Sequence, residues 1–179
     1  MLFKKITFLL ATLVMMSWGL NLQAQNDKSK RPSPPAEASA TLGDLAIQIN
    51  YSSPGVKGRT IWGGLVPFDK VWRTGANEAT TFEVSGDVMI EGQKLSAGKY
   101  ALFTIPGEKE WTFIFNKEAD QWGAYNYNQK KDALRIKAKP GKAAEFTERM
   151  TFSVNTKGKK AANVSLAWAD LAVGFKVTK

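Results

Sequence analysis

The 179-residue chain contains neither cysteine nor histidine. Without cysteine there can be no disulfides, so packing and hydrogen bonding alone must stabilise the fold. The same absences exclude Ser-His-Asp and Cys-His catalysis and the usual ligand sets of zinc, copper, haem and iron–sulfur sites. Carboxylate pairs, a Ser-Lys nucleophile and oxygen-liganded Ca²⁺ or Mg²⁺ remain chemically open, but no calcium-binding or phosphate-binding loop motif occurs. We therefore expect no cofactor and no metal.

A long uninterrupted apolar run is also missing. Residues 6–20 are largely apolar and follow two lysines, but polar residues dilute a run already shorter than the roughly 20 residues that span a bilayer. This pattern predicts a secretory signal peptide over residues 1–24, cleaved between Ala24 and Gln25. No cysteine follows for a lipid anchor, so we expect a periplasmic or secreted protein with no transmembrane segment after cleavage.

Strong charge of one sign is absent as well. The formal net charge is +9, and removing the two lysines of the predicted signal peptide leaves +7 on 155 residues. Basic residues cluster in the tail at 28–31, at 130–131 and at 157–160. We interpret these clusters mainly as solvated turns and tails, because no nucleic-acid-binding motif organises them. The sequence predicts no nucleic-acid partner and leaves the oligomeric state undetermined.

Composition divides the rest of the chain in two. Residues 25–40 are polar and proline-rich, which predicts a disordered linker. From Thr41 to the end, short alternating segments are separated by turn residues, which predicts a single all-β domain over 41–179. About nine or ten strands of this kind indicate an antiparallel, jelly-roll-like β-sandwich with at most one or two short helices.

Two segments give more detailed predictions. "KYALFTIPG" and "EWTFIFNK" form the clearest hairpin, with residues 106–109 as its turn, and the first strand has apolar groups on both faces. It should therefore be a central strand of the sandwich. A short helix is expected in "GKAAEFTERM", residues 141–150, although its flanks favour strands.

Polar and aromatic residues suited to a binding site concentrate between positions 51 and 81, where several glycines and a Pro-Gly pair shape the backbone. Within this part, the stretch "VWRTGANEAT" combines an indole, a guanidinium, an amide and a carboxylate. A second motif, "QWGAY", adds one more indole. The candidate ligand-binding residues are Tyr51, Arg59, Trp62, Arg73, Asn77, Glu78 and Trp122.

These residues allow two interpretations. In the functional one, Arg73 and Arg59 bind a carboxylate or phosphate, a tryptophan stacks on the ligand, and Glu78 fixes hydroxyls or acts in acid–base chemistry. In the structural one, Trp72 fills the core and Glu78 pairs with Arg73 or Arg59 to close one end of the sandwich. Trp111 and Trp168, which lie within strands, are predicted to be core residues.

"YSSPGVKGRTIWGGLVPFDKVWRTGANEAT", followed by "LSAGKYALFTIPGEKEWTFIFNK" and "QWGAYNYNQKKDALRI", resembles a bacterial domain-of-unknown-function family, the one numbered 2911. The resemblance covers about residues 31–178. It implies an exported single-domain protein of Gram-negative bacteria. It assigns no activity, substrate or catalytic residue.

Three functions therefore stay open. The first is a non-catalytic binding module for a small anionic or carbohydrate ligand of the cell envelope. Exposed aromatic residues and arginines would form its binding site. The second is a hydrolase or lyase that uses Glu78 as general base and Arg73 to stabilise charge. The third is an envelope structural or assembly protein whose edge strands or basic tail contact a partner.

Overall fold

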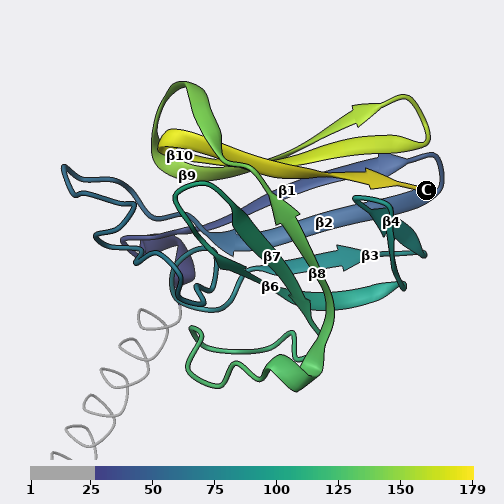
Figure 1. Ribbon diagram of the computed structural model, residues 1–179, viewed down its shortest axis with the longest axis horizontal. Helices are drawn as coiled ribbons and strands as arrows, with labels where there is room; N and C mark the ends of the chain where they lie inside the picture. Colours follow the sequence, from purple (N-terminus) through teal and green to yellow (C-terminus); the bar gives the residue numbers. More distant parts are fainter. Residues whose placement is uncertain (1–26) are drawn as a thin grey trace, which may run out of the picture.

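The computed structural model describes residues 27–179 and contains ten strands and two short 3₁₀ helices (Figure 1). The predicted signal peptide and its cleavage point lie outside these residues. The strands are β1 (Pro35–Leu42), β2 (Leu45–Ser52), β3 (Thr81–Val84), β4 (Val88–Ile90), β5 (Gln93–Leu95), β6 (Gly98–Ile105), β7 (Trp111–Asn116), β8 (Asp132–Ala138), β9 (Gly141–Lys157) and β10 (Ala161–Thr178). The helices are η1 (Lys28–Lys30) and η2 (Gln129–Lys131).

The strands form two antiparallel sheets, which confirms the predicted β-sandwich. The larger sheet has the order β1-β2-β3-β6-β7-β8, and the smaller has the order β5-β4-β10-β9. In Figure 1 the β9–β10 hairpin lies above β1 and β2, while β6 and β7 lie below. The chain passes from the larger sheet to the smaller one through the turn after β3, and returns after β5.

Strand β6 lies in the middle of the larger sheet, between β3 and β7, as its two apolar faces predicted. Its inner face contributes Leu102 to the core between the sheets, and its outer face contributes Phe103 to a smaller cluster. The β6–β7 hairpin with its turn over 106–109 is likewise confirmed.

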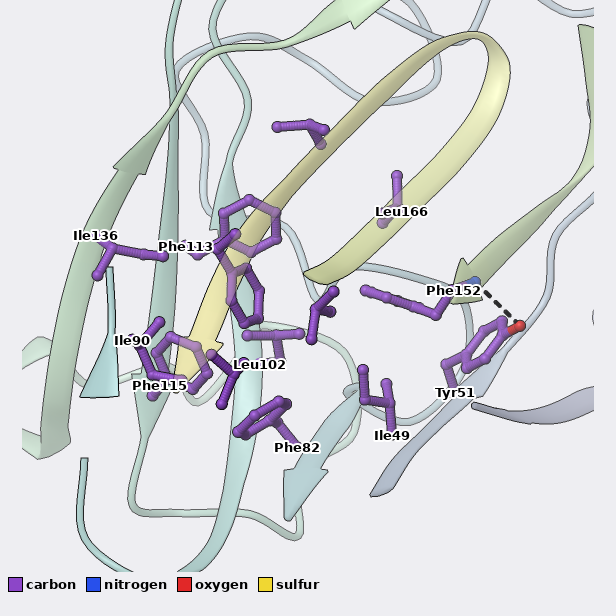
Figure 2. Packing of buried hydrophobic residues seen from close by; sticks show 14 of the residues in the cluster. Ile49, Tyr51, Phe82, Ile90, Leu102, Phe113, Phe115, Ile136, Phe152 and Leu166 are labelled. Atoms are coloured by element: carbon purple, nitrogen blue, oxygen red, sulfur yellow. Dashed lines mark hydrogen bonds between the residues drawn. The ribbon is translucent and has the colours of Figure 1, made fainter. Parts of the chain in front are cut away.

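The core between the sheets is built from side chains at alternate positions of facing strands. Figure 2 shows Ile49, Phe82 and Leu102 of the larger sheet near Leu166 and Phe152 of the smaller one. Each large aromatic ring buried here removes about 150–250 Å² of surface from water. The alternating burial along β2 and β10, together with the inward-facing residues of β6, thus supplies the packing that stabilises a fold without disulfides.

Four indoles form a cluster at one end of this core, from Trp62, Trp72, Trp111 and Trp168. Trp62 meets the rings of the other three edge to face at 5.0–5.9 Å, and Trp72 stacks on Trp168 at 6.0 Å. Trp111 and Trp168 are almost wholly buried, as predicted. Trp72 is also buried, and its indole N–H donates to the carbonyl of Gly75, which fixes the turn after it.

Two predictions about secondary structure are wrong. Residues 35–40, expected in a disordered linker, belong to β1, which pairs with β2 along its full length. The inward positions of β1 are mostly alanines, so the hydrophobic alternation of this segment is too weak to indicate a strand. The proline that opens the strand is tolerated because β1 is an edge strand. Residues 141–150, expected to include a helix, are part of β9, because pairing with β10 outweighs local helix propensity.

Within residues 27–179, no helix is long and apolar enough to cross a membrane. The same residues bring together no group of three or more acidic side chains that would suit a metal ion.

Candidate functional site

The outer face of the larger sheet is covered only in part. Loops from 53–80 and 117–131 cover a small apolar cluster formed by Ala79, Ala101, Phe103 and Ile114. The ring of Tyr127, from the second loop, packs edge to face on Phe103 at 5.1 Å. Toward β1 this cover ends, and a cleft opens over outward-facing polar side chains of β2 and β3.

A cleft of about 230 Å³ lies at this margin. Its floor is the outer face of β2, β3 and β6, and its walls come from the N-terminal segment and the end of the loop before β3. Asn50 and Thr81 sit opposite each other in the register of β2 and β3, so both reach the floor. The lining residues are Lys28, Arg31, Pro35, Asn50, Tyr51, Ser52, Glu78, Ala79, Thr81 and Lys99.

Residues 27–34, here called the N-terminal strap, form one wall of the cleft (purple in Figure 1). Asp27 caps η1 by accepting a hydrogen bond from the backbone N–H of Ser29. Further along, the carbonyl of Ser33 accepts from the side-chain amide of Asn77 at 3.1 Å, and that of Pro34 accepts from the backbone of Ser53 at 2.8 Å. The strap is therefore attached to the domain through polar contacts.

Glu78 is the carboxylate at the centre of the cleft wall. Nη1 of Arg31 donates to both of its oxygens, at 3.0 and 2.8 Å, and Nζ of Lys28 lies 3.0 Å from Oε1. Neither Arg73 nor Arg59 forms an ion pair with Glu78 within residues 27–179, so the predicted partners of this carboxylate are wrong. The arginine that pairs with Glu78 lies 47 positions earlier, on the strap.

These contacts change the acidity of Glu78. Partial burial by itself raises its pKa, but hydrogen bonds from its own backbone N–H, Lys28 and Arg31 outweigh that effect and lower the pKa from 4.5 to about 2. The carboxylate is therefore ionised over the whole neutral and mildly acidic range. Its stabilising contribution is fully present above pH 4.5 and is lost as the pH falls toward 2.

We expect Glu78→Gln to lower the melting temperature at pH 7 by a few degrees. A part-exposed ion pair contributes at most about 1 kcal/mol, which corresponds to roughly 2–4 °C for a domain of this size. Because the folded-state pKa is depressed, the difference from the wild type should shrink as the pH is lowered from 4.5 to 2. The measurement is a pair of thermal melts at each pH.

Glu83→Gln is the matched control for this variant. Glu83 lies on the outer face of β3, the strand that follows the loop of Glu78, and makes no ion pair within the described residues. Its melting temperature should follow the wild type at every pH. A Glu78→Gln difference that stayed constant from pH 7 to pH 2.5 would contradict the assignment of the ion pairs.

The other predicted site residues are distributed over three places. Tyr51 lines the cleft, but its hydroxyl accepts a hydrogen bond from the backbone N–H of Phe152 in the core (Figure 2). Arg59 donates to carbonyls of its own turn, at Val56 and Gly55. Trp62 belongs to the tryptophan cluster and not to the cleft.

Arg73 and Asn77 lie in the same loop as Glu78, but their side chains have different environments and contacts. Burial lowers the pKa of Arg73, and its Nε has no hydrogen-bond partner within the described residues. Asn77 adopts a φ of 57° and holds the strap. Of these two, only Asn77 therefore contacts the cleft wall, through the strap.

Trp122 lies on the margin of the cleft. It forms a β-bridge with Glu78, and the backbone N–H of Gly123 donates to the carbonyl of Asn77 at 3.0 Å. The guanidinium of Arg31 lies 5.9 Å from the centre of the Trp122 ring. The ring is 55% exposed, so a large aromatic surface faces solvent next to the cationic wall.

Sequence reasoning missed several residues of this cleft. Lys28 and Arg31 appeared only as members of a basic tail, and Asn50, Thr81 and Lys99 were not singled out. A signal for the last three was present, because they occupy the polar positions of alternating strands. No local pattern indicates that the tail returns to Glu78.

The chain belongs to the family described as "Protein of unknown function (DUF2911)", which matches residues 33–177. No match was found among the curated proteins or the solved structures. The matched part includes Glu78, Lys99 and Trp122, whereas Lys28 and Arg31 precede it. The two cations of the strap therefore lie outside the part of the chain that matches the family.

Proposed function

We propose that this protein is a non-catalytic binding module that holds a small anionic or carbohydrate ligand of the cell envelope in the cleft. One observation carries the proposal: three cationic side chains, Lys28, Arg31 and Lys99, line a cleft that contains a single carboxylate. Lys28 and Arg31 pair with Glu78, and Lys99 pairs with the exposed Asp120 outside the lining, so the three cations exceed these two carboxylates by one positive charge. Such a cleft attracts anions over a distance and holds them by charge-assisted hydrogen bonds.

The floor of the cleft supports the same function. Within the described residues, the side chains of Asn50, Ser52 and Thr81 have no hydrogen-bond partner, although each is able to donate and accept. A few convergent polar groups of this kind orient a small ligand. The volume is below the roughly 300–1,000 Å³ of sites that enclose a drug-sized molecule, so a ligand group about the size of one sugar ring is accommodated.

A hydrolase or lyase based on Glu78 and Arg73 receives less support. A carboxylate with a pKa of about 2 is a weak base, and general bases work best when their pKa is near the working pH. Glu78 is also the only carboxylate among the described residues that line the cleft, so a carboxylate pair is not assembled there. Binding without chemistry accounts for both observations.

The experiment is calorimetric titration of the chain from residue 25 with inorganic phosphate and with D-glucuronate. We expect the double variant Lys28→Ala/Arg31→Ala to bind each anion at least about tenfold more weakly, because each charge-assisted hydrogen bond contributes about 1.5–3 kcal/mol. Lys157→Ala/Lys159→Ala removes the same charge from the β9–β10 turn and is the control. Equal losses of anion affinity in both double variants, or no anion binding by the wild type, would contradict the proposal.

A further inference from the structure

The 117–131 loop presents two exposed aromatic side chains, Trp122 and Tyr125, here called the aromatic platform, and Trp122 lies at the margin of the cleft. Trp122 and Tyr125 are 55% and 84% exposed, whereas the other tryptophans of residues 27–179 are buried or half-buried. Phe146 of β9 is exposed as well. The β-bridge between Trp122 and Glu78 fixes the platform beside the cleft wall. Arg31 contacts both, since it pairs with Glu78 and lies over the Trp122 ring.

Gly123 lies between the two members of the platform and close to the ring of Tyr125. Gly123 has a φ of 66°, and a Cβ at this position would lie 2.8 Å from the ring of Tyr125. The Tyr125 ring therefore packs directly on the glycine, and a side chain there would displace it.

Size and chemistry together restrict the ligand. The cleft accepts about one sugar-sized group, so a ligand that also covers the platform must extend beyond it. A sugar ring has a face of C–H groups that packs on an indole, and hydroxyls at its edge that reach polar side chains such as Asn50 and Thr81. The cationic lining requires a negative group on the part that enters the cleft.

Resting on the proposed function, we infer that the ligand is an acidic oligosaccharide. One residue enters the cleft and places its carboxylate against Lys28, Arg31 and Lys99, and the next ring packs on Trp122. The carboxylate of the first sugar binds in the cleft. Packing of the next ring on Trp122 favours a saccharide over other anions. This assigns a second subsite to the "QWGAY" motif.

The test compares four probes on the chain from residue 25: a galacturonate trisaccharide, D-galacturonate, neutral maltotriose and inorganic phosphate. We expect the trisaccharide to bind about three- to tenfold more tightly than D-galacturonate alone, in line with one aromatic packing contact. Trp122→Ala should remove this gain, so that the variant binds the trisaccharide no more tightly than it binds D-galacturonate. Trp122→Phe, which keeps an aromatic face, should retain most of the gain, and maltotriose should bind weakly or not at all.

The outcomes separate this inference from the function on which it rests. Phosphate binding that depends on Lys28 and Arg31, together with a trisaccharide that binds no more tightly than its monomer, overturns the oligosaccharide and leaves the anion-binding module intact. A gain that survives in Trp122→Ala overturns the platform. Maltotriose binding as tight as that of the galacturonate trisaccharide overturns the acidic ligand, and a chain that binds no anion overturns both proposals.

Discussion

Gly174→Ala should lower the stability of this domain more than any other single methyl group added to it. A Cβ at position 174 would lie 2.2 Å from the carbonyl oxygen of Val164 and 3.0 Å from the Cα of Ser165. Both are backbone atoms of the first half of β10, which the second half approaches closely after the bend at Ala169. Backbone in a paired strand moves little, so the added methyl group must distort the sheet.

We expect a loss of at least about 3 kcal/mol, the upper end for overpacking, and a melting temperature lower by roughly 6–12 °C. The matched control is Gly141→Ala, because a Cβ there meets nothing within 4 Å. Alanine at that position should be neutral or slightly stabilising, since it reduces the freedom of the unfolded chain. Thermal melts that placed the two variants within a degree of each other would contradict the close approach inside β10.

Asp132→Ala should produce the second large loss. The largely buried carboxylate of Asp132, at the start of β8, accepts hydrogen bonds from the Tyr127 hydroxyl at 2.7 Å, Arg135 Nε at 2.7 Å and Asn116 Nδ2 at 2.8 Å. Burial, with the hydrogen bond to Asp132, raises the pKa of Tyr127 to about 12, so the phenol stays protonated and able to donate. Three donors therefore lose their acceptor together.

Breaking a buried pair costs about 3–5 kcal/mol, and we expect the lower end because the side chain of Arg135 is one-third exposed. The melting temperature should fall by roughly 6–12 °C. Asp120→Ala is the control: its side chain is 92% exposed and, among residues 27–179, pairs only with Lys99, so the substitution should change stability by less than about 0.5 kcal/mol. A small effect of Asp132→Ala in the same melts would mean that water replaces the carboxylate, and the network would not anchor the 117–131 loop.

Much of the fold could be predicted from the sequence because its signals are local. The alternation along β2 and β6 and the Pro-Gly turn between β6 and β7 depend only on neighbouring residues. Strand β1 was not predicted because its inward positions are mostly alanines, so its composition resembles that of a linker. Its strand conformation depends on pairing with β2, which the local sequence does not indicate. The expected helix in β9 failed for the related reason that pairing with β10 is long-range.

The site was predicted only in part, because its defining contacts join distant segments. The sequence singled out Tyr51, Glu78 and Trp122, and the structure places these three in or beside the cleft. It gave Glu78 the wrong arginines, since nearby cations in the chain are the natural candidates and the true partners lie on the strap. Arg59 was predicted as a ligand-binding residue from its residue type, but its guanidinium donates a hydrogen bond to the carbonyl of Gly55 in its own turn.

The central claim is that anions bind in the cleft rather than over the basic surface as a whole. The most direct measurement is a two-dimensional NMR titration of the ¹⁵N-labelled chain from residue 25 with D-glucuronate at constant ionic strength. We expect the largest shift changes at the backbone amides of Asn50, Glu78 and Thr81 and at the indole N–H of Trp122. Changes of equal size at the lysine-rich turn over 157–160, or none in the cleft, would contradict the claim.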